Sequence, residues 1–506
     1  MDFISCKFLA CSQKPFAFPE IELPINAPRR ARMDKSHKYY VNGAWVDPVA
    51  YRDFEVIHPG NEEVIATIAL GSSSDVDHAV AAATEAFNTW QFSTVDERVA
   101  LLERMIIAYE KRSEAFIKVM SQEIGTTLSF SREVQMPVGI GHLEAAIEAL
   151  KAHQFERPSL RGGSTLIDEP VGVVGMITPW NWPVNQIMIK VAPALAAGCT
   201  IVLKPSEYSP LSAIMLAEVI DEAGCPPGVF NLVNGDGPGV GEAISAHPGI
   251  HMVSFTGSTR AGKLVTKSAA NSIKRVTLEL GGKSPNLFFA DADLDAAARI
   301  SVDACFINNG QSCDAASRLL VERKIYDEVV ERVTQIVENT KVDDPMKEGS
   351  HIGPVVNKKQ FEHVQRLIQV GIDDGARLAA GGLGRPAGFN KGYYIRPTLF
   401  ADVTNDMEIA QQEVFGPVLA ILPFDTEEEA IEIANDTPYG LAAYIQSTDQ
   451  ERIHRVSRKL RAGVISVNGK VGDYDVPFGG YKESGNGREA GPMGFHEYLE
   501  TKAITM

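Results

Sequence analysis

The segment VGVVGMIT at residues 171–178 is the first of four short apolar segments separated by longer stretches of helical periodicity. The other three are TIVLKP at 200–205, VFNLVNG at 229–235 and HMVSFTG at 251–257. β-Branched runs that alternate with helical stretches are typical of parallel strands joined by right-handed helical crossovers. The alternation therefore predicts an α/β fold built on the kind of sheet that binds nucleotides.

A second round of alternation runs from about residue 287 to residue 468. It comprises helical pattern at 292–308, the strand-like RLLVE at 318–322, a long helical pattern at 326–338 and the strand-like PVLAILPF at 417–424. A chain of 506 residues is also too long for one ordinary hydrophobic core. We therefore expect a second α/β domain.

On the N-terminal side, Ser74, followed three residues later by an aspartate, predicts the start of an amphipathic helix that continues to Trp90. More helical pattern follows from residue 95 to about residue 150. Residues 1–33 lack the charged start, apolar core and cleavage site of a secretory signal. We expect them to form a disordered N-terminal extension, or translation to begin at Met33.

The composition excludes several classes of partner. A net charge of -17 opposes binding to a phosphate backbone, so no nucleic-acid partner is expected. The most apolar long stretch, residues 171–203, is interrupted by proline and polar residues too often to span a membrane. The six cysteines include no CxxC pair, which favours a reducing, cytoplasmic setting and indicates no metal site.

Two residues are candidates for catalysis on their local sequence. Cys313 lies in the segment FINNGQSCDAASR, but a lone cysteine is more often a small buried apolar residue than a nucleophile. Glu279 lies in LELGGK, at an apolar strand end before two glycines. Burial would disfavour its charged form and raise its pKa towards that of a general base. A glutamate satisfied by a salt bridge is the alternative interpretation.

A third candidate is Asn181 in the loop TPWNWP at 178–183. The two prolines make this loop stiff, so the Asn181 amide can be held in one orientation as a hydrogen-bond donor, although a stiff turn packed by tryptophan fits equally. The glycine-rich GDGPGVG at 235–241 has the wrong spacing for the GxGxxG fingerprint. Glycine spacing alone therefore does not identify a dinucleotide site.

Seven motifs together make the chain resemble the aldehyde dehydrogenase superfamily from about Tyr39 to Ile504. They occur in the order and at the approximate spacing of that family. The motifs are PWNWP (179–183), KPSE (204–207), FTGST (255–259), LELGGK (278–283), GQSC (310–313), EVFGP (413–417) and PFGGYKESGNGRE (477–489).

The resemblance implies a Rossmann-like cofactor-binding domain, a second α/β catalytic domain and a small β oligomerisation extension. The expected boundaries are 34–150 and 171–281 for the dinucleotide-binding domain, 282–481 for the catalytic domain, and 151–170 and 490–506 for the oligomerisation segments. A homodimer or homotetramer is expected from the same resemblance.

The resemblance further implies NAD-dependent oxidation of an aldehyde to a carboxylic acid. Cys313 would form a thiohemiacetal and then a thioester, and Glu279 would be the general base that activates water for hydrolysis. Asn181 and the backbone N–H of Cys313 would stabilise the oxyanion. Two alternatives stay open: a coenzyme A-acylating dehydrogenase, although such relatives usually lack this glutamate, and a catalytically silent structural or binding member.

The resemblance assigns the remaining site residues to a cofactor set and a substrate tunnel. A carboxylate at Glu207 would accept from ribose hydroxyls and repel a 2′-phosphate, so NAD should be preferred over NADP. The cofactor set is Thr178, Trp180, Lys204, Ser206, Glu207, Gly257, Ser258, Glu413 and Phe415. The tunnel set is Trp182, Gln186, Ile189, Ile307, Ser312, Asp314 and Phe478.

The substrate is expected to be an aldehyde of broad or hydrophobic type. Ile189 occupies a place where relatives that enclose a trimethylammonium group often carry an aromatic ring. Because a cation–π contact needs a ring face, this residue weakens the case for a betaine aldehyde.

Overall fold

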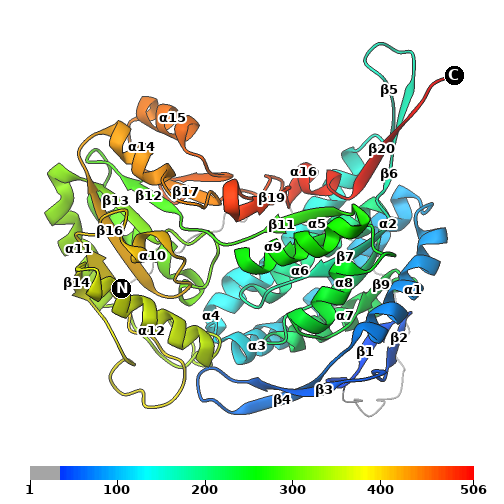
Figure 1. Cartoon of the computed structure of the whole chain (residues 1–506), viewed down its shortest axis with the longest axis horizontal. Coiled ribbons are helices and arrows are strands. Elements are labelled where there is room, and N and C mark those ends of the chain that lie inside the picture. The colour runs from blue at the N-terminus through cyan, green and yellow to red at the C-terminus, as the bar shows by residue number, and fades with distance from the viewer. Residues whose placement is uncertain (1–34) are drawn as a thin grey trace.

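The computed structural model describes residues 35–506, so the expectation for residues 1–33 lies outside the described residues. Two large sheets with their helices form the body of the molecule (Figure 1). The first sheet has eight strands in the order β19-β11-β10-β7-β8-β9-β1-β2. Their bounds, in that order, are β19 (Gly485–Asn486), β11 (Arg275–Glu279), β10 (Met252–Thr256), β7 (Val173–Ile177), β8 (Thr200–Lys204), β9 (Phe230–Leu232), β1 (Tyr39–Val41) and β2 (Ala44–Val46).

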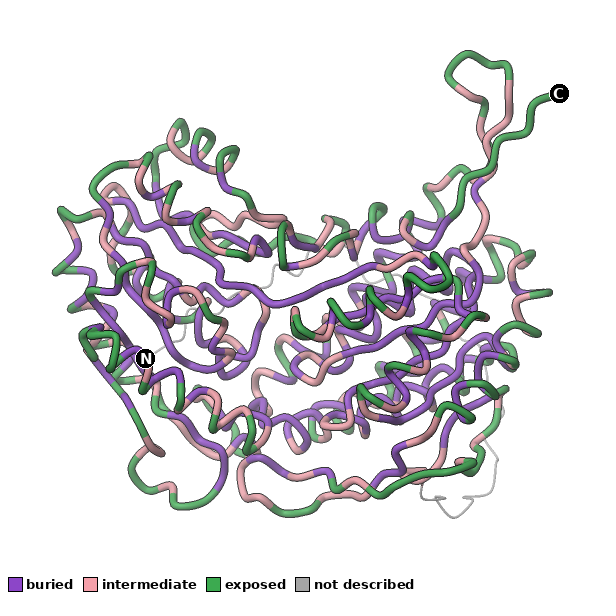
Figure 2. The backbone as a smooth tube through the Cα atoms, viewed as in Figure 1, coloured by how far each residue is buried: buried purple, intermediate pink, exposed green. Residues whose placement is uncertain are grey.

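The four apolar segments that suggested the fold form the centre of this sheet. They become β7, β8, β9 and β10, and these strands together with β11 pair in parallel. β7, β8 and β10 are buried along their whole length, as Figure 2 shows for the centre of the molecule. Parallel strands buried on both faces account for runs that are continuously apolar rather than alternating. The predicted α/β fold class is confirmed.

Helices cover both faces of the first sheet. On β7, Val174 and Met176 pack into one core with α2, α5, α6 and α7, whereas Val173 and Ile177 pack into another with α1, α8 and α9. Successive side chains of a strand point to opposite faces, which explains this division. The helices associated with this sheet are α1 (Ser73–Trp90), α2 (Val95–Glu110), α3 (Ser113–Ile124), α4 (Leu128–Phe130), α5 (Met136–Ala152), α6 (Pro183–Ala197), α7 (Pro210–Glu222), α8 (Glu242–Ala246) and α9 (Thr259–Ala269).

The second sheet has seven strands in the order β14-β15-β16-β13-β12-β17-β18. The strand-like RLLVE becomes β13, PVLAILPF becomes β16, and the predicted helix at 326–338 is α11. The strand bounds are β14 (Arg377–Ala380), β15 (Thr398–Ala401), β16 (Val418–Phe424), β13 (Arg318–Glu322), β12 (Pro285–Phe288), β17 (Ala442–Gln446) and β18 (Val464–Val467). The helices are α10 (Leu294–Gly310), α11 (Tyr326–Glu338), α12 (Lys358–Asp373), α13 (Glu408–Gln411), α14 (Glu427–Asn435) and α15 (Gln450–Lys459).

Two small sheets complete the molecule. β5 (Glu156–Pro158), β6 (Thr165–Pro170) and β20 (Leu499–Ile504) form an arm that projects from the body next to the C-terminus (Figure 1). The short α16 (Gly491–His496) precedes β20, and β3 (Arg52–Ile57) pairs with β4 (Val64–Leu70) in a ribbon along one side of the molecule. Within residues 35–506 we find no helix with the length and apolarity needed to cross a bilayer.

The predicted start of the first helix is wrong by two residues. The cap is Ser72, not Ser74, because the backbone N–H of Ser72 donates to the Asp75 carboxylate over 2.8 Å. Three consecutive serines, Ser72 to Ser74, lie at the start of this helix, and two of them have an aspartate three residues later, so both satisfied the cap spacing. The predicted end at Trp90 is confirmed.

Candidate functional site

The parallel strands of the first sheet bring the predicted residues to one edge. Ile177 at the end of β7 is opposite Lys204 at the end of β8, and Thr256 at the end of β10 is opposite Glu279 at the end of β11. Ligands of open α/β sheets bind at the carboxyl ends of the strands. The residues that follow these four strand ends therefore lie at the same edge of the sheet, where such a ligand would bind.

Lys204 is a buried cation held by backbone oxygens. Its ammonium donates to Gly235 O over 2.6 Å and to Pro205 O over 2.8 Å, and it lies 3.5 Å from the Glu207 carboxylate. Burial lowers the pKa of Lys204, and the Glu207 charge opposes that shift. The pair places one cation and one partly exposed carboxylate side by side at the end of β8, a donor and acceptor set suited to ribose hydroxyls.

Polar atoms without a partner lie beside this pair. Among the described residues, the buried Thr178 hydroxyl and both amide atoms of Asn234 have no hydrogen-bond partner. Gly257 follows β10, and Ser258 caps α9 by accepting from Ala261 N over 3.3 Å. Unpaired buried polar atoms and a helix N-terminus at one sheet edge fit a polar, anionic ligand such as a dinucleotide.

Glu413 and Phe415 reach this region from the second sheet. Gly282 N donates to the Glu413 carboxylate over 2.9 Å, and burial raises the pKa of Glu413 to about 7. Phe415 has a left-handed φ of 56° and packs edge-on against Trp180 with ring centroids 5.4 Å apart. The EVFGP segment thus meets both the LELGGK turn and the PWNWP loop.

Cys313 lies at the end of a segment that we call the nucleophile loop, residues 307–314. A side chain on Gly282 would come within 2.2 Å of Cys313 O, so the two backbones touch where only glycine fits. Burial raises the pKa of the Cys313 thiol well above its usual value, and the charges of Asp314, Glu413 and Glu279 raise it further. Attack on an aldehyde needs the thiolate, so the thiol proton must leave before the sulfur can react.

The PWNWP loop is hydrogen-bonded directly to the nucleophile loop. Asn181 Nδ2 donates to Gln311 O over 3.1 Å, and Trp182 Nε1 donates to Ser312 Oγ over 3.1 Å. Asn181 is buried, with 3% of its surface exposed. Its side-chain amide is therefore anchored two residues before Cys313, as an oxyanion donor would need to be.

Glu279 is 2% exposed, and neither of its carboxylate oxygens has a hydrogen-bond partner among the described residues. A side chain on Gly479 would come within 2.6 Å of Glu279 Oε1. Burial raises the pKa of Glu279 well above its usual value, and the Glu489 charge raises it further. A carboxylate with free lone pairs and a raised pKa is equipped to take a proton from water.

Two further charged residues of the site were missed in the sequence. The buried Lys190 ammonium on α6 donates to the Glu489 carboxylate and, over 2.7 Å, to Thr256 Oγ1. The Lys190 charge lowers the pKa of Glu279, opposing Glu489. We call Glu279, Glu489 and Lys190 the carboxylate cluster. The one sequence signal was a lysine as the single charged residue of a mostly apolar helix, because such a cation needs a buried partner.

The predicted tunnel residues lie in four places. Trp182, Ser312 and Asp314 form a hydrogen-bonded chain in which the Ser312 hydroxyl donates to Asp314. Gln186 and Ile189 are buried on α6, whereas Ile307 begins the nucleophile loop. Phe478 exchanges two backbone hydrogen bonds of 2.7 Å with Glu489, which puts it beside the carboxylate cluster. Phe130, absent from the predicted set, packs edge-on against Trp182 at 5.4 Å.

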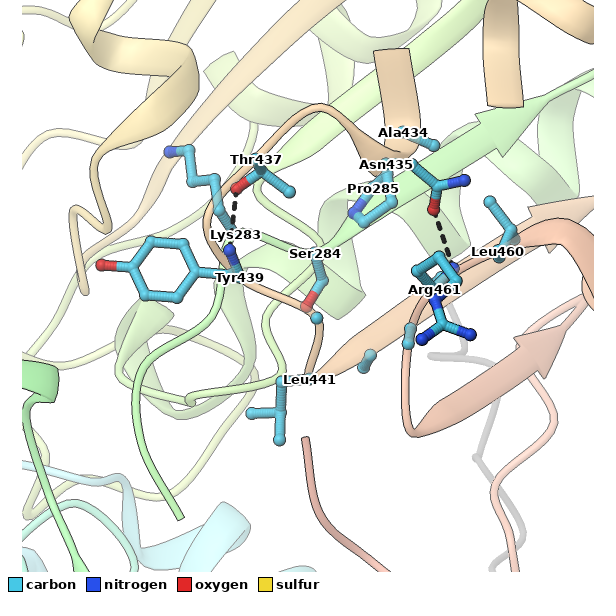
Figure 3. Close-up of a pocket in the computed structure, with 14 residues that line it drawn as sticks. Lys283, Ser284, Pro285, Ala434, Asn435, Thr437, Tyr439, Leu441, Leu460 and Arg461 are labelled. Atoms are coloured by element: carbon cyan, nitrogen blue, oxygen red, sulfur yellow. Dashed lines mark hydrogen bonds between the residues drawn. The ribbon is translucent and has the colours of Figure 1, made fainter. Parts of the chain in front are cut away.

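A small cavity lies behind the LELGGK turn (Figure 3). Figure 3 shows Lys283 and Tyr439 on one side of it and Asn435 and Arg461 on the other. Burial and the neighbouring Arg318 lower the pKa of Lys283 to about 7. The residues that line this cavity include none of the predicted catalytic or cofactor residues. We therefore regard it as part of the support of the turn, not as the site.

The structure holds no group of three or more histidine, cysteine or acidic side chains suited to a metal ion within residues 35–506. In the same range Cys199, Cys225, Cys305 and Cys313 are free thiols.

Comparison with known proteins identifies close relatives over almost the whole chain. The model of the aldehyde dehydrogenase family matches residues 45–504. A 3-succinoylsemialdehyde-pyridine dehydrogenase from a Pseudomonas species is 49% identical over 468 residues, which are 92% of this chain and 98% of that protein.

Solved structures agree with this similarity. The crystal structure of an aldehyde dehydrogenase from Bartonella henselae has a TM-score of 0.92 and 50% identity, covering 93% of this chain and 99% of that one. A cysteine-to-alanine variant of aldehyde dehydrogenase C from Pseudomonas syringae, in complex with NAD+ and octanal, has a TM-score of 0.92 and 47% identity, covering 94% of this chain and 98% of that one.

Proposed function

Since this chain belongs to the aldehyde dehydrogenase family, we propose that it oxidises an aldehyde to a carboxylic acid with NAD, through a covalent thioester on Cys313. The predicted family, fold class and enzyme class are confirmed by the relatives. The observation that carries the proposed mechanism is the Glu279 carboxylate, buried without a hydrogen-bond partner among the described residues and close enough to Cys313 for its charge to act on the thiol.

In the first step the Cys313 thiol gives its proton to water, and a bond forms between its sulfur and the aldehyde carbon. The carbonyl oxygen becomes an oxyanion, which Asn181 Nδ2 and the Cys313 backbone N–H would stabilise by about 3 to 4 kcal/mol per donor. The anchoring of Asn181 to Gln311 O supports this role, because the amide is held two residues from the sulfur. A free aldehyde is a poor hydride donor, whereas the tetrahedral adduct is a good one.

When bound, NAD would supply the hydride acceptor, and loss of hydride from the adduct would leave a thioester on Cys313. The Lys204–Glu207 pair and the unpaired Thr178 hydroxyl would hold it from the first sheet, and Glu413 and Phe415 from the second. Glu279 then takes a proton from water, the hydroxide attacks the thioester carbon, and the carbon–sulfur bond breaks to release the acid. The raised pKa of Glu279 supports this role as general base.

We expect NAD to be preferred over NADP because the Glu207 carboxylate would face a 2′-phosphate. The Pseudomonas syringae relative was solved with NAD+, which supports NAD as the cofactor here. Glu207→Ser should raise kcat/KM with NADP relative to NAD by about tenfold, the effect of removing ~1.4 kcal/mol of charge repulsion. Steady-state kinetics with both cofactors check this, and Glu218→Ser, on the outer part of α7, is the matched control. An unchanged ratio in the Glu207 variant would contradict the assignment.

The proposed substrate is a neutral hydrophobic aldehyde. Trp182, with Phe130 against it, offers an aromatic wall next to the nucleophile loop, and the Pseudomonas syringae relative was solved with octanal. Asp314 adds a carboxylate beside Cys313, and no ion pair joins it to a cation in the part of the chain that the structure describes. A substrate that carries its own carboxylate would be repelled there.

A screen of aldehydes with NAD and NADP, followed by the absorbance of the reduced nicotinamide, tests the function. Cys313→Ala should reduce turnover to background, because an alanine side chain cannot form the thioester. Addition of coenzyme A distinguishes the first rival, which would yield an acyl-coenzyme A in place of free acid. A wild-type rate equal to background across the panel would favour the silent structural member.

Assembly and location are part of the proposal. β5 and β20 are the two edge strands of the arm, and each leaves one edge unpaired within the described chain. Such edges are suited to pairing with another copy in a homodimer or homotetramer. Free cysteines support a reducing, cytoplasmic location.

A further inference from the structure

We propose that Asn308 is a positioning residue that sets the Asn181 amide against Cys313 by fastening the PWNWP loop to the nucleophile loop. Asn308 is 4% exposed and lies five residues before the sulfur. This inference rests on the proposed function, because it assigns Asn308 a role through the oxyanion donor of that reaction.

The backbone at Asn308 is the first sign of a special role. α10 spans Leu294–Gly310, but the chain leaves helical geometry at Ile307, and Asn308 (φ 51°), Asn309 (φ 62°) and Gly310 (φ 76°) are all left-handed. For residues other than glycine this conformation is disfavoured, although asparagine tolerates it best. Consecutive left-handed residues persist only where surrounding contacts hold them, and such backbone is concentrated at functional sites.

The Asn308 side chain supplies those contacts to both loops at once. Its Nδ2 donates to Asn181 O over 2.7 Å and to Gln311 O over 3.3 Å. Gln311 O also accepts from Asn181 Nδ2 over 3.1 Å. Asn308 therefore holds the backbone of Asn181 by a hydrogen bond. The side chains of Asn308 and Asn181 also share one acceptor, Gln311 O, which lies two residues before Cys313.

The other end of the Asn308 amide is held from outside the site. Its Oδ1 accepts from Gln135 Nε2 over 3.1 Å, and Gln135 is the last residue of a π-helical turn at Ser131–Gln135. Single π-helical turns are rare and recur at functional sites. Two acceptors around the nitrogen and one donor at the oxygen also leave only one orientation of the amide that satisfies every partner.

Asn309 provides an internal control. It is also left-handed and 3% exposed, and its Nδ2 donates to two backbone oxygens, Gly125 O and Pro354 O, over 2.9 and 3.0 Å. None of its hydrogen bonds reaches the PWNWP loop. Loss of either side chain therefore removes a similar number of buried hydrogen bonds, but only Asn308 links Asn181 to the nucleophile loop.

The test compares Asn308→Gly with Asn309→Gly, because glycine keeps the left-handed backbone without strain. Asn308→Gly should lower kcat/KM for the aldehyde by about tenfold to 10²-fold, the range expected when a catalytic group is misplaced. In an Asn181→Ala background it should cost less than about threefold, because no amide remains to be positioned. Asn309→Gly should act equally in both backgrounds.

Multiplicative effects of Asn308→Gly and Asn181→Ala, or an equal loss in Asn309→Gly, would overturn the inference. Asn308→Asp is the second variant if Asn308→Gly does not fold. It keeps the shape and the tolerance of left-handed backbone, but it turns a carboxylate oxygen towards two carbonyl oxygens and should lower kcat/KM by at least about tenfold relative to wild type.

A measurement that needs no turnover distinguishes a failure of this inference from a failure of the proposed function. Aldehyde in the absence of cofactor should protect Cys313 from alkylation by iodoacetamide, since the adduct occupies the sulfur. Asn308→Gly should need about tenfold more aldehyde for the same protection, while its alkylation rate without aldehyde stays within about threefold of wild type. Unchanged protection, or a strongly changed basal rate, contradicts the inference alone. Absence of protection in the wild type contradicts the proposed function and, with it, the inference.

Discussion

The nucleophile loop and the carboxylate cluster are two regions of one site built on opposite principles. The nucleophile loop is held by neutral amides, with Asn308 and Asn309 donating to backbone oxygens of other segments. The carboxylate cluster is made of buried charges, in which Glu489 and Lys190 act on the Glu279 carboxyl in opposite directions. The amides of the nucleophile loop control geometry, and the charges of the carboxylate cluster control the protonation of Glu279.

The difference indicates how each region should respond to mutation. A neutral amide network keeps its hydrogen bonds across the ordinary pH range, so its loss should reduce rates by a similar factor at every pH. Buried charges exert their effect through the pKa of a neighbour, so their loss should move a pH profile. The three predictions below concern the charged groups on the two sides of this comparison, from the largest expected effect to the smallest.

Glu279→Gln should reduce kcat by about 10² to 10⁴, the usual contribution of a general base. Acylation of Cys313 precedes the hydrolysis step, so about one equivalent of reduced nicotinamide per site should still form rapidly before turnover stalls. Rapid-mixing absorbance and the intact mass of the acylated protein check this outcome.

Glu123→Gln is the matched control for Glu279. Glu123 is also a buried glutamate, with its pKa raised to about 8 by burial, but its carboxylate accepts from Leu211 N and Ser212 N at the start of α7. Loss of the Glu123 carboxylate should lower the stability of the fold without producing a burst of reduced nicotinamide. A kcat of Glu279→Gln within tenfold of wild type would remove the carboxylate cluster from the hydrolysis step.

Glu489→Gln should move the acid limb of the pH–rate profile to lower pH. The base is active as the carboxylate, so activity is lost as pH falls through the pKa of Glu279, and the Glu489 charge raises that pKa. The measurement is kcat against pH with a hydrophobic aldehyde. An acid limb that stays in place or moves to higher pH would contradict the role of the Glu489 charge in setting the pKa of Glu279.

Glu489→Gln leaves Lys190 buried without its partner, which costs about 3–5 kcal/mol. The double variant Lys190→Met/Glu489→Gln removes both charges and is the version to use if the single variant does not fold. Its acid limb should also move to lower pH, but by less, because the opposing effect of Lys190 on the pKa of Glu279 is lost as well.

Asp314→Asn should produce the smallest effect, a shift in the reactivity of the thiol. The Asp314 charge raises the pKa of Cys313, so its removal should move the midpoint of Cys313 alkylation to lower pH. Asp473→Asn, an exposed residue of the segment before Phe478, is the control that should leave the midpoint unchanged. An equal shift in both variants would indicate a general effect of net charge.

Much of the fold could be predicted because local pattern and packing agree. β13 and α11 begin and end at the predicted residues, since apolar runs with polar ends specify both the element and its limits. The end of the helix predicted at 292–308 is a boundary that the sequence pattern could not locate. The residue types there are compatible with a helix. The hydrogen bonds that stabilise the non-helical backbone join Asn308 to Gln135 and to Asn181.

The sequence by itself determined the α/β alternation, the seven motifs and the identity of Cys313, Glu279 and Asn181 as candidates, because these depend on residue type and short-range spacing. Only the tertiary structure decided which other residues position these three candidates or shift their pKa values. Lys190 and Glu489 meet across 299 positions, and Asn308 meets Asn181 across 127. A pKa or an amide orientation depends on what lies within a few ångström in space, and the pattern along a chain does not contain those distances.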